Sequence, residues 1–168
     1  MIRIQYYQTP VGELILGAYG NQLCMADWRY RKMRKSIDAR LQKGLKAKYV
    51  EQDTPVLKET RIRLDAYFNR ERENFDIPLL MVGTDFQKQV WQGLIDIPYG
   101  TTCSYLELSK KIGNEKAVRA VASANGANAI SIIIPCHRII GSDGSLVGYA
   151  GGLVVKKKLL KLEQSLFI

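Results

Sequence analysis

Hydrophobic and polar residues alternate along the first 28 residues with the two-residue period of half-buried β-strands. Three such segments cover residues 2–7, 13–18 and 22–28. The connections between them contain Pro10, Gly12 and Gly20-Asn21, which favour tight turns. The chain is therefore expected to begin with a small antiparallel sheet.

A helical period follows after residue 52. Asp53-Thr54-Pro55 is typical of an N-cap with proline in the first turn, and Leu57, Leu64 and Phe68 continue one apolar face to about residue 69. Residues 77–80 (Ile-Pro-Leu-Leu) read as a linker. We therefore expect an N-terminal domain over 1–81 and a C-terminal domain over 82–168.

The second half has the pattern of several short helices. Thr84 with Gln87, and Ser104 with Glu107, have the spacing of capping boxes. The second of these helices ends at Gly113, and another is predicted from 115 to about 125, which together make a helix-turn-helix pattern. The apolar stripe of the first helix consists of Phe86, Val90, Trp91 and Leu94. These elements predict an α+β fold, with a helical C-terminal domain.

The predicted second helix of this pair has two different sides. At about 100° per residue, one side carries apolar residues, namely Ala117, Val118, Val121 and Ala124. The other side carries Arg119, Ala122, Ser123 and Gly126. Three very small residues beside one arginine would let the helix approach another surface closely, although an ordinary alanine-rich helix has the same pattern.

Composition places the chain among ordinary globular proteins, because 46% of its 168 residues are hydrophobic and 24% are charged. No apolar run approaches the ~20 residues of a membrane helix, and the first residues do not have the pattern of a signal peptide. Cys24, Cys103 and Cys136 are too few and too scattered for a disulfide framework. His137 is the only histidine and there is no C-x-x-C, so we expect no metal site. We also expect no cofactor and no membrane partner, and the scattered cysteines favour a cytoplasmic location.

The net charge of +9 favours a polyanionic partner. Residues 29–48 contain nine basic residues and a single acid, Asp38. This stretch is either a solvated helical face or connector, or a surface that faces DNA, and the sequence leaves both interpretations open.

The candidate chemistry lies near residue 136. Ser131-Ile132-Ile133-Ile134 is a short apolar run, which predicts a buried strand. Cys136, His137 and Arg138 follow directly after Pro135. A free thiol with a pKa of ~8.5 is mostly protonated at neutral pH, and an adjacent imidazole and guanidinium would favour the thiolate. A buried, unreactive cysteine is the alternative.

A last helix is predicted from 153 to 166, with Lys156 and Glu163 on its apolar side. Buried charges need partners. The two residues could pair with each other or extend to the rim of the helix. Alternatively, Glu163 could orient His137, as an acid orients the base of a catalytic triad.

Residues 135–140 (Pro-Cys-His-Arg-Ile-Ile) and 148–153 (Gly-Tyr-Ala-Gly-Gly-Leu), followed by Lys156 and Glu163, closely resemble the O6-alkylguanine-DNA alkyltransferase family. The match runs without gaps from about Thr84 to Glu163. The resemblance implies a ribonuclease-H-like N-terminal domain. It also implies a monomer that flips a nucleotide from the minor groove of double-stranded DNA and moves the alkyl group of O6-alkylguanine irreversibly to its own cysteine. This is a single-turnover reaction of DNA repair.

The resemblance also implies roles for individual residues. Cys136 matches the alkyl acceptor, His137 the residue that deprotonates it through a bound water, and Glu163 the acid that holds the histidine. Asn128 matches an asparagine that ties the recognition helix to the active-site segment. Tyr105 matches a tyrosine that aids nucleotide rotation and donates a proton toward guanine.

Further matched positions concern substrate and DNA. Arg119 matches an arginine that enters the base stack, and the small outer residues Ala122, Ser123 and Gly126 share its helix face. Tyr149 and the backbone of Ala150 match the guanine pocket, and Lys156 matches a lysine beside it. Ala150 replaces a serine of some members, and the histidines of a zinc site found in some N-terminal domains are missing here.

Two alternatives remain at this stage. Alkyltransferase-like proteins bind the lesion without repairing it, but they lack the acceptor cysteine that this chain has at Cys136. A thiol hydrolase that uses Cys136, His137 and Glu163 would turn over repeatedly on a peptide or ester and would ignore DNA.

Overall fold

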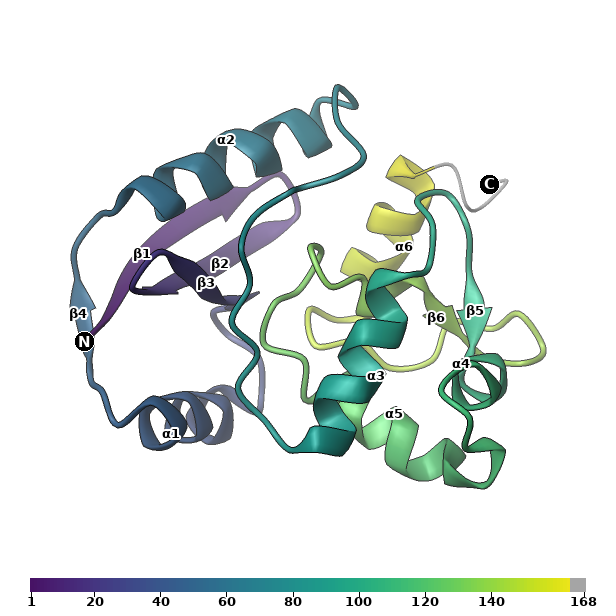
Figure 1. The fold of residues 1–168 in the computed structure, drawn as a ribbon. Coiled ribbons are helices and arrows are strands. Elements are labelled where there is room, and N and C mark those ends of the chain that lie inside the picture. Colours follow the sequence, from purple (N-terminus) through teal and green to yellow (C-terminus); the bar gives the residue numbers. More distant parts are fainter. Residues whose placement is uncertain (164–168) are drawn as a thin grey trace. The chain divides into compact units, whose positions relative to one another are not determined.

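The structure is a computed structural model that describes residues 1–163. The chain divides into two compact units, Met1–Gly83 and Thr84–Ile168 (Figure 1). Strands come first and most helices follow, so the α+β fold class is confirmed.

Four strands form the sheet of the first unit, in the order β3-β2-β1-β4. They are β1 (Ile2–Thr9), β2 (Gly12–Tyr19), β3 (Gln22–Trp28) and β4 (Tyr49–Glu51). The first three are antiparallel neighbours, as predicted, with Thr9 opposite Gly12 at the first turn. The short strand β4 pairs with β1 in parallel. It was not predicted, because three residues are too few to show an alternation of hydrophobic and polar positions.

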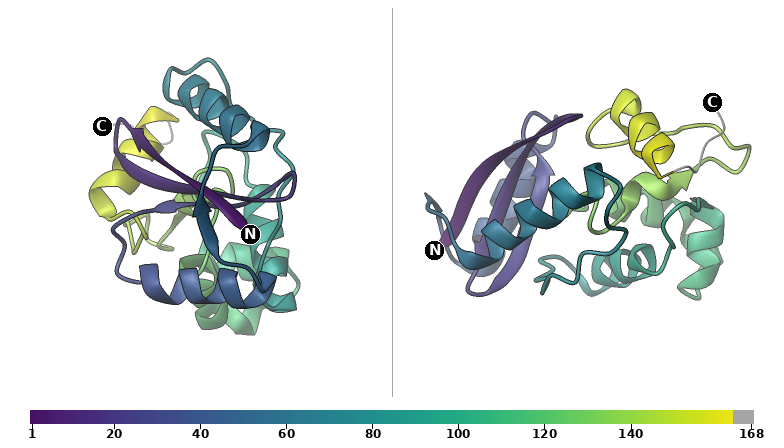
Figure 2. Two further views of the ribbon diagram at one scale, coloured as in Figure 1. Left: turned by 90° about the vertical axis from the view of Figure 1, so that its left-hand side faces the viewer. Right: turned by 90° about the horizontal axis from the view of Figure 1, so that it is seen from above.

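Two helices accompany this sheet: α1 (Arg34–Leu45) and α2 (Pro55–Phe68). They lie on opposite sides of the sheet (Figure 2). The predicted N-cap is confirmed, because Thr54 Oγ1 accepts a hydrogen bond from the Leu57 N–H at 3.2 Å. The apolar face differs by one position from the prediction: Tyr67 is fully buried and Phe68 only half-buried.

Residues 77–80 are not a free linker, which corrects the prediction from sequence. The Leu23 N–H donates to the Pro78 carbonyl, and the Leu80 N–H donates to the Leu23 carbonyl, both at 2.8 Å. Strand β3 is an edge strand, and this segment satisfies hydrogen-bonding groups that the edge would otherwise leave open.

The second unit is mainly helical. It contains α3 (Asp85–Ile95), α4 (Tyr105–Lys111), α5 (Val118–Gly126) and α6 (Leu153–Leu162), with a short parallel pair, β5 (Cys103–Ser104) and β6 (Ile139–Ile140). Both predicted capping boxes are present, at Thr84 and at Ser104. The Trp91 indole N–H donates to the Ala124 carbonyl at 2.8 Å and so fixes α5 against α3.

Helices α4 and α5 form the predicted pair around Gly113, whose φ of 79° is readily adopted by glycine. The second helix begins later than predicted, because Glu115–Ala117 is a 3-10 turn and the α-helix starts at Val118. The last helix ends at Leu162, and the final residues of its predicted span, 164–166, lie outside the described residues.

The predicted strand at residues 131–134 is wrong. These residues form a buried turn, in which the Ile134 N–H donates to the Ile130 carbonyl at 2.9 Å. Ile132 has a φ of 70°, a conformation that a β-branched residue adopts only under constraint. The apolar run therefore predicted the burial of these residues correctly and their backbone conformation incorrectly.

Over residues 1–163, no helix has the length and apolar character needed to span a membrane.

Candidate active site

Cys136 begins a one-turn 3-10 helix, Cys136–Arg138, directly after the buried turn. Its backbone N–H donates to the Ile134 carbonyl at 2.8 Å, and the residue is 3% exposed. Strand β6 follows at once and pairs with β5, so the cysteine is held between two fixed segments. The thiol therefore sits on rigid backbone.

Asn128 ties this backbone to the end of α5. Its Oδ1 accepts from the Ile130 N–H at 3.0 Å, and its Nδ2 donates to the Ile134 carbonyl at 2.9 Å and to the Ile130 carbonyl at 3.4 Å. The side chain is buried. The Asn128 amide thus satisfies backbone groups at both ends of the 131–134 turn. The turn ends at Ile134, two residues before Cys136.

His137 and Glu163 form a buried pair, with 2.7 Å between Nε2 and Oε2. Glu163 follows directly after α6. Its carbonyl lies close to Gly100, where any side chain would bring a Cβ to within 3.2 Å of this oxygen, a tight contact. Of the two interpretations of the buried glutamate, the structure supports the one in which Glu163 orients His137.

The electrostatics of the pair define its protonation state. Burial raises the pKa of Glu163, but the hydrogen bonds that it accepts from His137 and Arg138, together with the charge of the Arg138 guanidinium, outweigh this effect and bring the pKa to about 2. Burial lowers the pKa of His137, and Glu163 opposes this only in part. An ionised carboxylate beside a neutral imidazole requires the proton on Nε2, which leaves the lone pair on Nδ1.

Arg138 has a different role from the one expected from sequence. Its guanidinium donates to both carboxylate oxygens of Glu163, at 2.8 and 3.1 Å, and to the Ile97 carbonyl at 2.7 Å. It therefore neutralises Glu163, whereas the sequence predicted an effect on the thiol. The partner lies 25 residues away in the chain, so no local signal could have identified it.

Tyr105 is the first residue of α4 and lies near Cys136. Burial and the negative charge of the cysteine raise the pKa of its hydroxyl, and a hydrogen bond with the Asn125 side chain lowers it in part. Asn125 is a buried residue of α5 that the sequence interpretation missed. Its position on the inner side of a helical pattern was the only available signal.

Lys156 does not pair with Glu163. It is fully buried, and its Nζ donates to the Val147 carbonyl at 2.7 Å and to the Gly148 carbonyl at 3.1 Å. Burial lowers its pKa to about 8, although the charge of Cys136 opposes the shift. The lysine thus anchors the loop that carries Tyr149, whose ring centroid lies 6.4 Å from that of His137, and the half-buried Ala150.

The outward face of α5 is as predicted. Arg119, Ser123 and Gly126 are exposed and Ala122 is half-buried, whereas Val121 and Ala124 are buried. The structure therefore separates two groups of predicted residues in this unit. Tyr105 and Lys156 lie near Cys136, Glu163 and Tyr149 lie beside the adjacent His137, and Asn128 is bonded to the preceding turn. The other group, Arg119, Ala122, Ser123 and Gly126, lies on the outward face of α5.

The other two cysteines are poor candidates for nucleophiles. Burial raises the pKa of Cys24 to about 12. Burial, followed by the charge of Glu107, also raises the pKa of Cys103. Within residues 1–163, no group of His, Cys, Asp and Glu side chains is arranged to hold a metal ion.

Comparisons with known proteins cover both units. Residues 2–81 match the model of the 6-O-methylguanine DNA methyltransferase ribonuclease-like domain, and residues 85–165 match the model of the DNA binding domain of the same family. A methylated-DNA–protein-cysteine methyltransferase of Methanosarcina barkeri is 44% identical over 94% of each chain. One of Haemophilus influenzae is 43% identical over 97% of this chain and 87% of its own.

Solved structures agree with this result. The Mycobacterium tuberculosis O6-methylguanine methyltransferase is similar with a TM-score of 0.83 and 38% identity, over 98% of this chain and 94% of its own. A complex of the M. tuberculosis protein with DNA matches with the same TM-score and identity, over 97% and 93%.

Proposed function

Because the chain belongs to the 6-O-methylguanine DNA methyltransferase family, we propose that it repairs double-stranded DNA by transferring an alkyl group from the O6 atom of guanine to the sulfur of Cys136. The observation that carries the proposal is the buried Cys136 beside the His137–Glu163 pair. Each molecule reacts once, because a thioether has no route back to a thiol here.

The thiol is activated by His137. With Nε2–H held by the ionised Glu163, the Nδ1 lone pair of the neutral imidazole receives the thiol proton through a bridging water. Glu163 then stabilises the imidazolium that forms, and Arg138 keeps Glu163 charged in its buried position.

The thiolate attacks the alkyl carbon in line, so that the S–C bond forms while the C–O6 bond breaks. The electron pair goes to guanine. Tyr105, whose hydroxyl is protonated at neutral pH, donates a hydrogen bond and then a proton to the departing base. The proton held by the His137 imidazolium then returns through solvent to the Tyr105 oxygen, which restores both side chains to their neutral forms. The products are S-alkylcysteine at position 136 and unmodified guanine in the duplex.

Access to the alkyl group requires that the nucleotide leave the base stack, at a cost of a few kcal/mol. The small residues Ala122, Ser123 and Gly126 let α5 enter the minor groove, and Arg119 fills the gap in the stack. Tyr149 and the Ala150 backbone receive the flipped guanine on the loop that Lys156 anchors.

We propose that residues 82–168 form the domain that carries DNA binding and chemistry, and that the protein acts as a monomer in the cytoplasm. All proposed active-site residues come from one unit of one chain. The cysteines of the described chain are free thiols, as a reducing compartment maintains them.

The test is the intact mass of the protein after reaction with a duplex that contains one O6-methylguanine. We expect a gain of one methylene unit, located on the peptide with Cys136 and limited to one equivalent per chain. Repeated turnover, or label on Cys24 or Cys103, would contradict the proposal.

A further inference from the structure

Within the basic stretch of residues 29–48, Arg31 and Arg34 face inward, whereas the lysines face solvent. Arg31 and Arg34 both bind the buried carboxylate of Asp27, at 3.1 Å each. The lysines of the stretch are all exposed, and we call them the lysine face: Lys32, Lys35, Lys43, Lys46 and Lys48.

No member of the lysine face forms an ion pair with a carboxylate within the part of the chain that the structure describes. Asp38, the one acid of the stretch, is bonded by Arg34 at 3.0 Å and by the Tyr49 hydroxyl at 2.6 Å. The positive charge of these lysines is therefore not compensated within the unit.

Helix α2, on the other side of the sheet, shows the opposite arrangement. Arg61 pairs with Asp53, and Arg63 pairs with Glu59, each at 2.7 Å. Outside residues 29–48, the first unit has six basic residues against nine acidic ones. The excess positive charge of this unit therefore lies in residues 29–48. Charged residues spread evenly over the surface for solubility alone would not produce this distribution.

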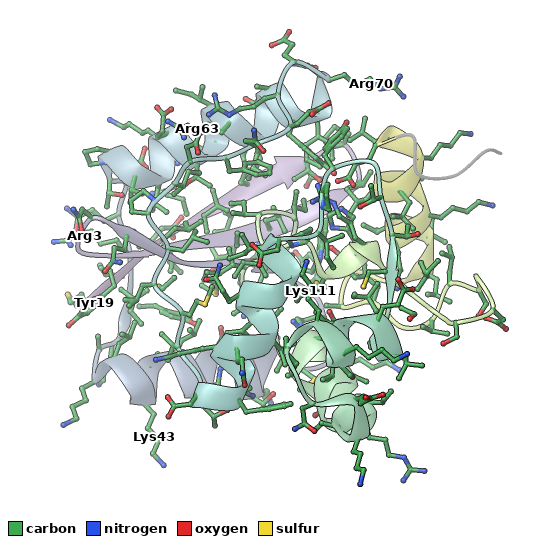
Figure 3. All side chains as sticks on the ribbon, turned by 45° about the vertical axis from the view of Figure 1, so that its right-hand side comes forward. Arg3, Tyr19, Lys43, Arg63, Arg70 and Lys111 are labelled. Atoms are coloured by element: carbon green, nitrogen blue, oxygen red, sulfur yellow. The ribbon has the colours of Figure 1, made fainter. Side chains whose placement is uncertain are left out.

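The outward arc of α1 has a shape that suits close approach. Ile37 and Leu41 are buried on its inner side, and Lys35, Ala39 and Lys43 are exposed on the outer side, with the small Ala39 between the two lysines. A rise of 1.5 Å per residue spaces Lys35 and Lys43 by about 12 Å along the helix. Figure 3 shows Lys43 extending from α1 into solvent.

We propose that the lysine face binds the sugar-phosphate backbone of duplex DNA, as a second and sequence-independent contact in addition to α5. This proposal rests on the DNA-binding function proposed above. Duplex DNA is a regular polyanion with one charge per ~1.7 Å, and lysine binds phosphate as a point charge without demanding a fixed geometry. A row of uncompensated lysines on a helix fits that partner.

The test compares two variants of the full chain that each lose two positive charges from the first unit. Lys35→Gln/Lys43→Gln alters the lysine face. Lys58→Gln/Arg70→Gln is the matched control, since both of these residues are also exposed. The affinity for an undamaged duplex is measured against salt concentration, and the rate with free O6-benzylguanine is measured in the same preparations.

We expect the slope of log affinity against log salt to fall by about 1.8 in the first variant, at ~0.9 per lost phosphate contact, and to change much less in the control. Equal changes in both variants would indicate a general charge effect and overturn the proposal. An unchanged slope in both variants would also overturn it and would favour an acidic protein as the partner of the lysine face. Unchanged transfer to the free base in all preparations keeps this outcome separate from a failure of the alkyltransferase reaction itself.

Discussion

At the scale of single residues, Glu163 is bonded to two neighbours that depend on its charge. It accepts hydrogen bonds from His137 and from Arg138, and all three side chains are buried. Removal of its charge would release the His137 tautomer and leave a buried guanidinium without its counter-charge. Both catalysis and stability should therefore respond to this one position, by different routes.

Glu163→Gln should slow alkyl transfer to free O6-benzylguanine by on the order of a hundredfold or more, the usual range for loss of general-base function. The reason is that an amide neither fixes Nε2–H on His137 as firmly nor stabilises the imidazolium. Glu115→Gln, at an exposed acid of the same unit, is the control and should react at the wild-type rate. An equal rate in the two variants would remove Glu163 from the mechanism.

The same carboxylate predicts a pH dependence of stability. Its pKa in the folded protein, about 2, lies below the ordinary value of 4.5, so its ionised form stabilises the fold above pH 4.5 and this contribution is lost as the pH falls toward about 2. At 1.36 kcal/mol per pKa unit, the loss amounts to about 3 kcal/mol. Urea unfolding across this window should give a steeper decline for the wild type than for Glu163→Gln, and parallel curves would argue against the shift.

At the scale of elements, the turn at residues 131–134 and helix α5 decide how chemistry and DNA binding are connected. Asn128 stands between them, with its amide bonded to the backbone at both ends of the turn. The strained φ of Ile132 persists because these bonds and the surrounding burial hold it. Helix α5 and Cys136 are thus connected through one hydrogen-bonded segment.

Asn128→Ala should lower the free energy of unfolding by about 2–3 kcal/mol, because buried backbone groups lose their partners. Transfer to the free base should slow as well, since Cys136 follows the loosened turn. Asn128→Asp retains the acceptor for the Ile130 N–H but sets a buried, unpaired carboxylate oxygen against the Ile134 carbonyl, so its stability at neutral pH should be no higher than that of Asn128→Ala. Chemical denaturation of the three proteins measures this order, and a wild-type value for Asn128→Ala would show that the turn holds without the amide.

Arg119→Ala should slow repair of a duplex by tenfold or more, which corresponds to about 1.4 kcal/mol, and leave the reaction with free O6-benzylguanine near the wild-type rate. A free base needs no flipping, so only the duplex reaction requires a side chain in the stack. Arg119→Lys should rescue poorly, because an ammonium cannot replace a planar stacking group.

Lys116→Ala removes an exposed cation three residues earlier and serves as the control for Arg119→Ala. It should lower the salt slope of binding at most, without a tenfold loss of duplex repair. An equal loss on free base and duplex in Arg119→Ala would mean that Arg119 supports the fold or the active site and not the flipped state.

At the scale of the whole molecule, the residues proposed for DNA binding differ from those proposed for chemistry. The helix-turn-helix surface of α5 faces solvent, whereas Cys136 is buried. Cys136→Ser should therefore abolish transfer while keeping the affinity for undamaged duplex within about twofold of wild type, or about 0.4 kcal/mol. A binding titration beside a transfer assay measures both, and loss of binding in a folded Cys136→Ser protein would contradict this separation.

The sequence by itself determined the features that depend on neighbouring residues. The hairpins of the first sheet, the caps at Thr54, Thr84 and Ser104, and the two sides of α5 were all predicted and are present. In each case, a residue's own backbone preference or a side chain bonded a few positions away supplies the signal. The Cys136-His137 pair was visible for the same reason.

Only the tertiary structure decided which distant groups meet. Arg138 binds Glu163 rather than the thiol, Lys156 caps two loop carbonyls rather than Glu163, and residues 77–80 complete the edge of β3. The apolar run at 131–134 became a turn because Asn128 and burial outweighed its preference for extended backbone. A buried polar group must find a partner, but its immediate sequence neighbours do not specify which one, because folding brings together groups that are well separated in the chain, as Arg138 and Glu163 are by 25 residues.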